Sequence, residues 1–138
     1  KYFYTNLHPN HEDIKKIEYE DFDKVKRVQY FYLIGQQHYK EIFRELKTKG
    51  IKIAFCTLGE WTNHNGFRNG TDISSILDLY NLKDSNIHNR KHLYSFREKH
   101  KNRVKENEIK CLYLQHKYGN RFMLLDDNYD QNLGGMND

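Results

Sequence analysis

The feature that most constrains the fold is a helical pattern that passes directly into a strand-like run. Four apolar residues recur at the spacing of one helix face, namely Tyr39, Ile42, Phe43 and Leu46. Lys47 and Gly50 then supply a cation and a glycine, which are typical of helix ends. The mostly apolar run 51–57 follows without a loop. Such a short helix-to-strand connection is typical of α/β proteins.

The chain before this helix predicts a β-hairpin. From Ile17 onward, apolar and charged residues alternate as far as Glu20, which is the pattern of a half-buried strand. Val25–Ile34 is a second strand-like run with a strongly apolar end, and the acidic segment Asp21–Lys24 indicates a turn between the two. We therefore expect a hairpin flap over about residues 14–34.

The second half of the chain predicts two more helices and one more strand. One helix is expected after the N-cap pair Thr71–Asp72, and another over 109–119, where Gly119 ends it. Arg121–Leu125 predicts the last strand, while Leu93–Phe96 fits either a short strand or a helix. We expect one domain over residues 1–138, a three-layer Rossmann-like α/β fold with a largely parallel sheet and the β-hairpin flap.

The composition is that of a globular domain with an aromatic-rich core. Hydrophobic residues make up 37% of the chain and aromatic residues 14%, and they cluster into segments, which argues against disorder. The net charge is only +4, whereas most nucleic-acid binders carry a more strongly basic surface stripe. No apolar run reaches the ~18 residues that a membrane-spanning helix needs. Two distant cysteines, Cys56 and Cys111, fit a reducing, intracellular compartment. We expect a monomer without a nucleic-acid or membrane partner.

The strongest candidate site is the acidic pair Asp126–Asp127 after the last strand. Ligands of open α/β sheets bind beyond the carboxyl ends of the strands. Two adjacent carboxylates repel each other unless a cation or a hydrogen-bond network compensates, and Mg²⁺ prefers such oxygen ligands. Asp126 and Asp127 are therefore predicted metal ligands for Mg²⁺. In the alternative interpretation, Asp126 caps the following turn and Asp127 is solvated.

Two further residues are candidates for binding a phosphoryl group. Thr57 ends the apolar run 51–57, where its hydroxyl can hydrogen-bond a phosphoryl oxygen, although threonine is also common at strand ends. Lys110 stands at the start of the helix that leads to the acidic pair. A lysine there is unfavourable to the helix dipole, so another interaction is expected to justify it. An ammonium group near a phosphate also offsets charge that develops in the transition state.

The order of these residues resembles the haloacid-dehalogenase superfamily. The segment 41–57 is similar to the helix and strand that lead into its second motif, which ends in Thr57, and Lys110 and Asp126–Asp127 resemble its third and fourth motifs. The step of 17 residues from Lys110 to Asp127 resembles the compact protein-phosphatase branch, which acts on phosphorylated polymerase tails. The resemblance covers roughly residues 29–130 and implies Mg²⁺-dependent hydrolysis of a phosphomonoester on a protein, through an aspartyl-phosphate.

The sequence differs from that family at the family's first motif. It is a strand that ends in Asp-x-Asp, in which the first aspartate is the nucleophile and the second the general acid/base. Asp21-Phe-Asp23 fits the string, but the residues before it are too charged for a strand buried on both faces, and they suit the hairpin instead. If the hairpin interpretation holds, the motif lies near or before Lys1, or the domain lacks its nucleophile.

Three functions remain open from the sequence. The first is a phosphatase with Thr57 and Lys110 as catalytic residues and a phosphorylated protein as substrate. The second is an inactive domain of the same fold that binds a phosphorylated or acidic partner. The third is an aromatic-rich nucleic-acid binder.

Several other polar or reactive residues carry weaker predictions. Cys56 and Cys111 are expected to be inert thiols, and Trp61 is expected to pack under a loop rather than line a pocket. His38 and His64 lie near predicted strand ends. The stretch 88–105 contains ten basic or histidine residues and one acid, which predicts a solvated face or a cap that contacts a phosphoprotein.

Overall fold

The computed structural model describes residues 11–20, 24–63, 70–100 and 104–126. It shows a mixed α/β protein with small parallel and antiparallel sheets. The contacts divide the chain into two compact units. The hairpin unit comprises Lys1–Phe55 and Glu60–Ile87, and the two-helix unit comprises Cys56–Gly59 and His88–Asp138. None of the helices in the described part is both long and apolar enough to cross a lipid bilayer.

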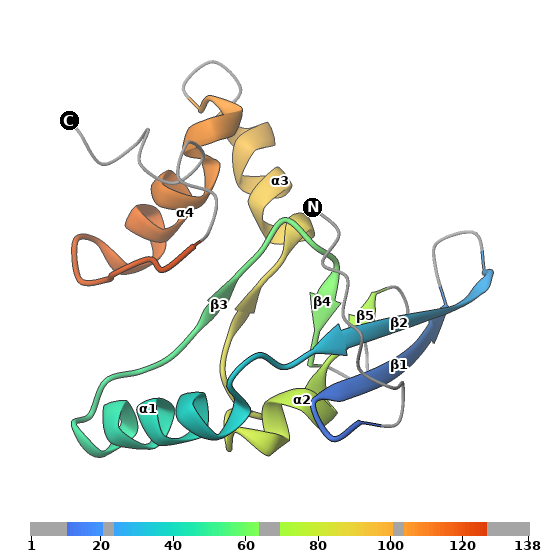
Figure 1. The fold of residues 1–138 in the computed structure, drawn as a ribbon. Coiled ribbons are helices and arrows are strands. Elements are labelled where there is room, and N and C mark those ends of the chain that lie inside the picture. The colour runs from blue at the N-terminus through green and yellow to red at the C-terminus, as the bar shows by residue number, and fades with distance from the viewer. Residues whose placement is uncertain (1–10, 21–23, 64–69, 101–103, 127–138) are drawn as a thin grey trace. The chain divides into compact units, whose positions relative to one another are not determined.

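The predicted hairpin is confirmed and forms one part of the hairpin unit (Figure 1). Strand β1 (Ile14–Glu20) pairs antiparallel with β2 (Lys26–Tyr32), with Ile17 opposite Gln29. Because side chains alternate between the faces of a strand, one face of the hairpin carries the buried Ile17. Phe31 lies on the same face and packs edge-on against Trp61, with 5.6 Å between ring centroids.

The other elements of the hairpin unit contribute the rest of its buried core. Helix α1 (Gln36–Thr48) is followed by the predicted glycine stop, Gly50, whose positive φ of 74° allows the chain to turn out of the helix. Helix α2 (Ser74–Leu79) has Ile73 as its N-cap, so the prediction of Thr71–Asp72 as the cap is wrong. That pair forms the short strand β5 (Thr71–Asp72), which runs parallel to β4 (Trp61–Thr62). The buried core of the unit consists of Ile17, Leu33, Ile73, Ile76, Leu77, Leu82 and Ile87.

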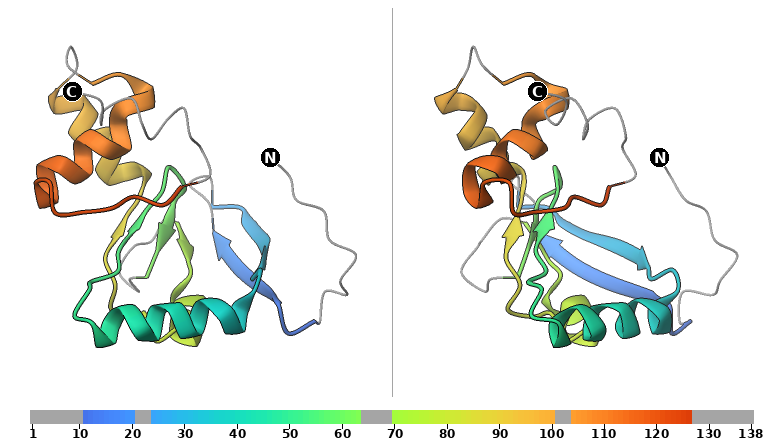
Figure 2. Two further views of the ribbon diagram at one scale, coloured as in Figure 1. Left: turned by 60° about the vertical axis from the view of Figure 1, so that its left-hand side comes forward. Right: turned by 90° about the vertical axis from the view of Figure 1, so that its left-hand side faces the viewer.

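The two-helix unit is built on α3 (Arg90–Lys99) and α4 (Ile109–Tyr118), which lie side by side in both views of Figure 2. The ambiguous segment Leu93–Phe96 is thus helical. Asn89 caps α3, because its side chain accepts hydrogen bonds from the first turn. A 3-10 turn, Glu106–Glu108, leads into α4, and Gly119 ends that helix as predicted. The buried core residues here are Leu93, Val104, Ile109, Tyr113 and Leu114.

A third sheet joins β3 (Phe55–Cys56) to β6 (Ile87–His88). The Phe55 amide donates to the Asn86 carbonyl, and the Thr57 amide donates to the His88 carbonyl. The hydrogen bonds advance in the same direction along both strands, so the two strands are parallel.

Two strand predictions are wrong in the described residues. The run 51–57 forms strand only over Phe55–Cys56, and Ile51 is 49% exposed. The segment 121–126 is extended but has no strand partner among the described residues, with Met123 81% and Leu125 84% exposed. Its other face packs, since Phe122 and Leu124 contact the core of the two-helix unit. Burial on both faces needs neighbours on both sides, and the described chain supplies them on one side only.

Candidate functional site

The site is built around an ion pair between Lys110 and Asp126 in the two-helix unit. Lys110 lies in the first turn of α4, and its Nζ donates a hydrogen bond to Asp126 Oδ2. The two side chains are only 10% and 11% exposed. The predicted conflict between a lysine and the start of its helix is thus resolved by a carboxylate partner, which stabilises the ammonium.

Local packing explains why these two residues meet. Ile109 is fully buried and fixes the start of α4 against the core. Along the extended segment 121–126, side chains alternate between two faces. Phe122 and Leu124 face the core of the two-helix unit, so Asp126 follows them on the same side. The alternation therefore delivers the carboxylate toward α4.

Thr57 directly follows β3, at the carboxyl end of the predicted apolar run. Its amide is bonded to the His88 carbonyl at 2.9 Å, and its Oγ1 accepts a hydrogen bond from the Gly59 amide at 2.9 Å. A hydroxyl that accepts one bond still has its own proton to donate. The turn thus orients the hydroxyl of Thr57 without using its donor.

The charges of the Lys110–Asp126 pair influence the thiol of Cys56. Burial raises the pKa of the Cys56 thiol to about 11, while Lys110 acts to lower it and Asp126 to raise it. Both charges thus act on Cys56, the residue directly before Thr57. Among the described residues, the structure shows direct contact between two of the four predicted site residues, Lys110 and Asp126. Asp127 lies outside the described residues.

A buried histidine, which the sequence interpretation missed, connects the same elements. His88 is 7% exposed, and its two ring nitrogens contact tyrosine hydroxyls of α4, at 3.0 Å for Tyr113 and 2.6 Å for Tyr118. Burial lowers the pKa of His88, with smaller contributions from His92 and Lys117. The His88 side chain contacts two tyrosines of α4, and its backbone carbonyl accepts a hydrogen bond from the Thr57 amide. His88 therefore connects the helix that carries Lys110 with the chain just after β3.

The donor set is partly suited to Mg²⁺. The described residues supply one carboxylate at the site, Asp126, and it already bonds Lys110. No three His, Cys, Asp or Glu side chains gather into a possible metal site within the described ranges. Mg²⁺ commonly uses one or two carboxylates and completes its shell with water and phosphate oxygens. Asp126 fits that role if a second acid joins it.

The remaining candidates have structural roles or lie outside the described residues. Cys111 is buried, and burial raises the pKa of its thiol, in keeping with the prediction of an inert cysteine. Trp61 packs against a ring of the hairpin, that of Phe31 on β2. His38 is exposed on α1. Asp21, Asp23 and His64 lie outside the described residues.

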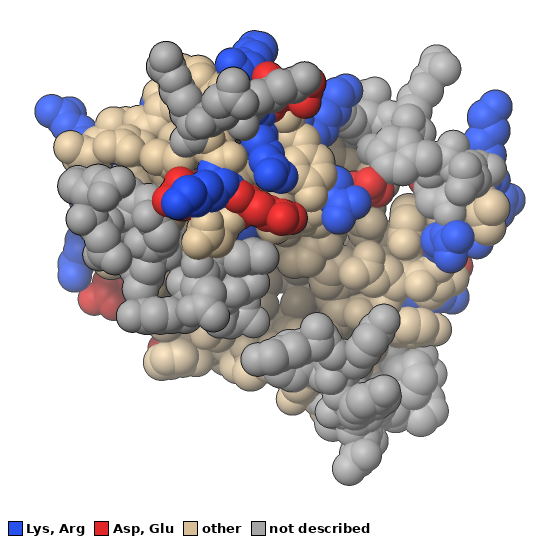
Figure 3. Space-filling model, turned by 90° about the horizontal axis from the view of Figure 1, so that it is seen from above, with Lys and Arg blue, Asp and Glu red and all other residues tan. Residues whose placement is uncertain are grey.

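The basic stretch 88–105 is only partly a solvated face. His88 and Asn89 are buried, which corrects the prediction for its first two residues. Arg90 is exposed but donates to the Leu58 carbonyl at 2.9 Å and lies over the ring of Tyr94. On the face drawn in Figure 3, basic side chains lie next to acidic ones.

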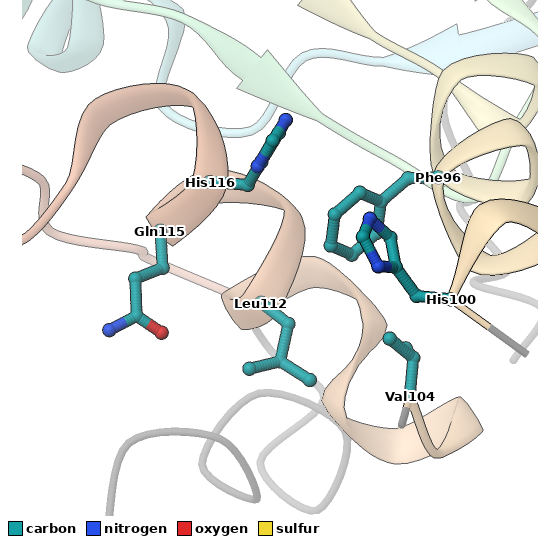
Figure 4. Close-up of a pocket in the computed structure, with 6 residues that line it drawn as sticks. All are labelled: Phe96, His100, Val104, Leu112, Gln115 and His116. Carbon is teal, nitrogen blue, oxygen red and sulfur yellow. The ribbon is translucent and has the colours of Figure 1, made fainter. Parts of the chain in front are cut away.

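A shallow hollow between α3 and α4 is a separate feature of the two-helix unit (Figure 4). It measures about 320 Å³ and is lined by Phe96, His100, Val104, Leu112, Gln115 and His116. Its three α4 residues follow the i, i+3, i+4 spacing of one helix face, and Lys110 lies on a different face. The hollow is therefore not part of the Lys110–Asp126 site.

No protein-family model, curated protein or solved structure matches this chain.

Proposed function

We propose that the two-helix unit carries part of a Mg²⁺-dependent phosphotransfer site, and that the protein hydrolyses phosphomonoesters on a phosphoprotein. The supporting observation is the nearly buried Lys110–Asp126 ion pair. Thr57 and Lys110 would hold phosphoryl oxygens, and Asp126 with Asp127 would ligate the metal.

The energetics of the pair favour a functional over a structural role. Removing two charges from water costs several kcal/mol per ion, and their attraction often does no more than offset that cost. An apolar pair of the same size would stabilise the two-helix core equally well. A nearly buried ammonium and carboxylate therefore support a functional site rather than a purely structural contact.

The geometry gives each residue a distinct task. The ammonium of Lys110 is held by Asp126, so a phosphoryl oxygen would meet a cation that is already oriented. The hydroxyl of Thr57, oriented by the Gly59 amide, would donate to another phosphoryl oxygen. A bound Mg²⁺ would neutralise phosphate charge.

The proposal also includes a sheet that is larger than the described one. The segment 121–126 is extended and has an exposed apolar face. A neighbouring strand that covered Met123 and Leu125 would produce the three-layer arrangement expected from the sequence. We propose that such a strand carries the Asp-x-Asp nucleophile. β1 is a poor candidate, because it is half of a hairpin with a single buried residue, Ile17.

A binding module is the second candidate function. It is favoured by the same ion pair, because the described residues show no aspartate other than Asp126 in contact with Lys110. Without a nucleophile, the site would bind a phosphorylated partner without turnover.

The test is hydrolysis of p-nitrophenyl phosphate with and without Mg²⁺, together with binding of phosphate and of phosphopeptides. The isosteric change Thr57→Val is expected to lower kcat/KM about 10- to 100-fold, the value of a hydrogen bond to a charged group. Lys110→Met is expected to lower it about 100- to 1,000-fold. Thr48→Val in the last turn of α1 and Lys49→Met at its C-cap are matched controls with no expected effect.

The outcomes separate the two functions. Mg²⁺-dependent turnover that depends on Thr57 and Lys110 supports the phosphatase. Mg²⁺-dependent phosphopeptide binding with no turnover, in a chain of verified full length, supports the binding module. If neither turnover nor binding responds to Lys110→Met, both functions are wrong.

A further inference from the structure

The hollow between α3 and α4 brings two histidines together within the two-helix unit, as Figure 4 shows. His100 is the C-cap residue of α3, and His116 lies on α4. Their ring centres are 6.2 Å apart. The ring of Phe96 contacts both, with its centre 4.7 Å from that of His100 and 5.4 Å from that of His116. The phosphotransfer proposal uses neither histidine.

The lining of the hollow favours a ligand that binds nitrogen. Besides the histidines it consists of the apolar Phe96, Val104 and Leu112, and of Gln115, whose amide points away from the two imidazoles in Figure 4. None of these described lining residues is an acid, a lysine or an arginine. The hollow therefore lacks the carboxylates that Mg²⁺ prefers and the fixed cations that hold a phosphate. Imidazole nitrogen is instead a preferred ligand of Zn²⁺.

The end of α3 adds little electrostatic attraction for a cation. A helix C-terminus carries partial negative charge, and His100 stands at that end of α3. Arg97 and Lys99 lie in the same last turn, and their positive charges oppose this attraction. The affinity for a metal ion must therefore come from bonds to the two ring nitrogens, and this selects an ion such as Zn²⁺ over Mg²⁺ or Ca²⁺.

The spacing of the two rings is close to that of a two-histidine zinc site. Zn²⁺ binds a histidine nitrogen at about 2.1 Å, so the ion lies about 3.2 Å from each ring centre. At a tetrahedral angle, the two ring centres are then about 5.2 Å apart, which is about 1 Å less than the separation observed. Side-chain rotation can close this difference, since His116 is exposed and His100 only half-buried.

We propose that His100 and His116 bind a Zn²⁺ ion in this hollow. Within the described ranges, no third histidine, cysteine or acid completes a metal site. Water therefore occupies the remaining positions of the tetrahedron, as it does in open zinc sites. The apolar side chains of Phe96, Val104 and Leu112 shield one side of the ion from solvent. With two protein ligands the binding is reversible, and we expect a dissociation constant of about 1–100 µM.

The test is isothermal titration calorimetry of Zn²⁺ into the full chain, with excess Mg²⁺ present throughout. His100→Gln and His116→Gln each remove one ligand, so each should weaken Zn²⁺ binding at least about 10-fold. His38→Gln is the matched control, because His38 is exposed on α1 of the hairpin unit and should leave the binding unchanged. Thermal unfolding verifies that each variant is folded.

A second measurement locates the ion. Diethyl pyrocarbonate acylates imidazole nitrogens, and peptide mass spectrometry reports each histidine separately. Bound Zn²⁺ should slow acylation of His100 and His116 and leave His38 unaffected, because a nitrogen bonded to the metal has no lone pair to react.

Three results would overturn the proposal. The first is a wild-type chain that binds no Zn²⁺ up to about 1 mM, and the second is Zn²⁺ binding that neither His100→Gln nor His116→Gln weakens. The third is a hollow that binds inorganic phosphate in place of Zn²⁺, with that binding lost in His116→Gln. None of these results depends on phosphatase activity, so the zinc site and the phosphotransfer site can fail separately.

Discussion

The Lys110–Asp126 pair gives the sharpest stability prediction. Lys110→Met removes the ammonium that pairs with the Asp126 carboxylate, whose side chain is only 11% exposed. Breaking a buried ion pair by removing one partner costs 3–5 kcal/mol, and the residual exposure places this pair at about 3 kcal/mol. For a chain of this size, 1 kcal/mol shifts the melting temperature by about 3–4 °C. The variant should therefore melt about 10 °C lower.

The double variant Lys110→Met/Asp126→Leu separates the free-energy cost of burying the two charges from the energy of their attraction. It removes both charges and fills the space with apolar atoms, so its melting temperature should lie within a few degrees of the wild type. Thermal unfolding followed by circular dichroism gives all four members of the cycle. We expect an interaction free energy of at least about 2 kcal/mol between the two positions.

An exposed ion pair in the same chain supplies the control. Lys49 and Glu45 are 3.8 Å apart, and their side chains are 66% and 71% exposed. Solvent screens such a pair, so Lys49→Met should cost no more than about 0.5 kcal/mol. If Lys110→Met costs as little as Lys49→Met, the pair is solvated and the reasoning for a buried charged site is refuted.

Three further predictions concern other groups of the fold. Burial lowers the pKa of His88, so the unfolded chain binds its proton more tightly. Stability should therefore fall as the pH drops below about 6.5, and His88→Gln should flatten that slope in melts between pH 5 and 8. The pKa of about 11 at Cys56, two above the ordinary 9.0, predicts that iodoacetamide alkylates the native thiol at pH 8 about 100-fold more slowly than in urea, and equal rates would contradict it. Gly70→Ala should unfold the hairpin unit at far lower denaturant than Gly50→Ala, because a Cβ at Gly70 would lie 2.6 Å from a backbone oxygen while none lies near Gly50.

Elements whose signals are local could be predicted from the sequence. The hairpin, α1 and α4 follow from alternation, from a period of 3.6 residues and from the glycines that end the helices. Asn89 is a comparable signal for α3, since an asparagine before a helical pattern satisfies the first free amides of the helix. The choice between strand and helix for 93–96 was therefore already determined at Asn89, outside the ambiguous segment.

Features that depend on distant neighbours could not be predicted in the same way. An apolar run such as Phe122–Leu125 indicates an extended chain, but whether its second face is buried depends on which segment lies beside it. The sequence predicts that Lys110 and Asp126 belong to one site, but it does not predict their direct contact. The role of His88 was missed, because its partners Tyr113 and Tyr118 are 25 and 30 residues away and no spacing rule connects them.

Because the Lys110–Asp126 pair has no net charge, both candidate functions require a bound metal ion. Lys110 and Asp126 together carry no net charge, because each neutralises the other. A phosphoryl dianion that approached the pair would gain from the ammonium and lose to the carboxylate, at nearly equal distances. A second cation is therefore needed for tight binding, and a divalent ion on Asp126 would change the net charge of the pair from zero to +2. Phosphate binding should then require Mg²⁺ whether or not a nucleophile is present, and Asp126→Asn should relax that requirement by leaving Lys110 as an uncompensated cation. Equally tight phosphate binding by the wild-type chain with and without Mg²⁺ would show that the pair is not the anion site.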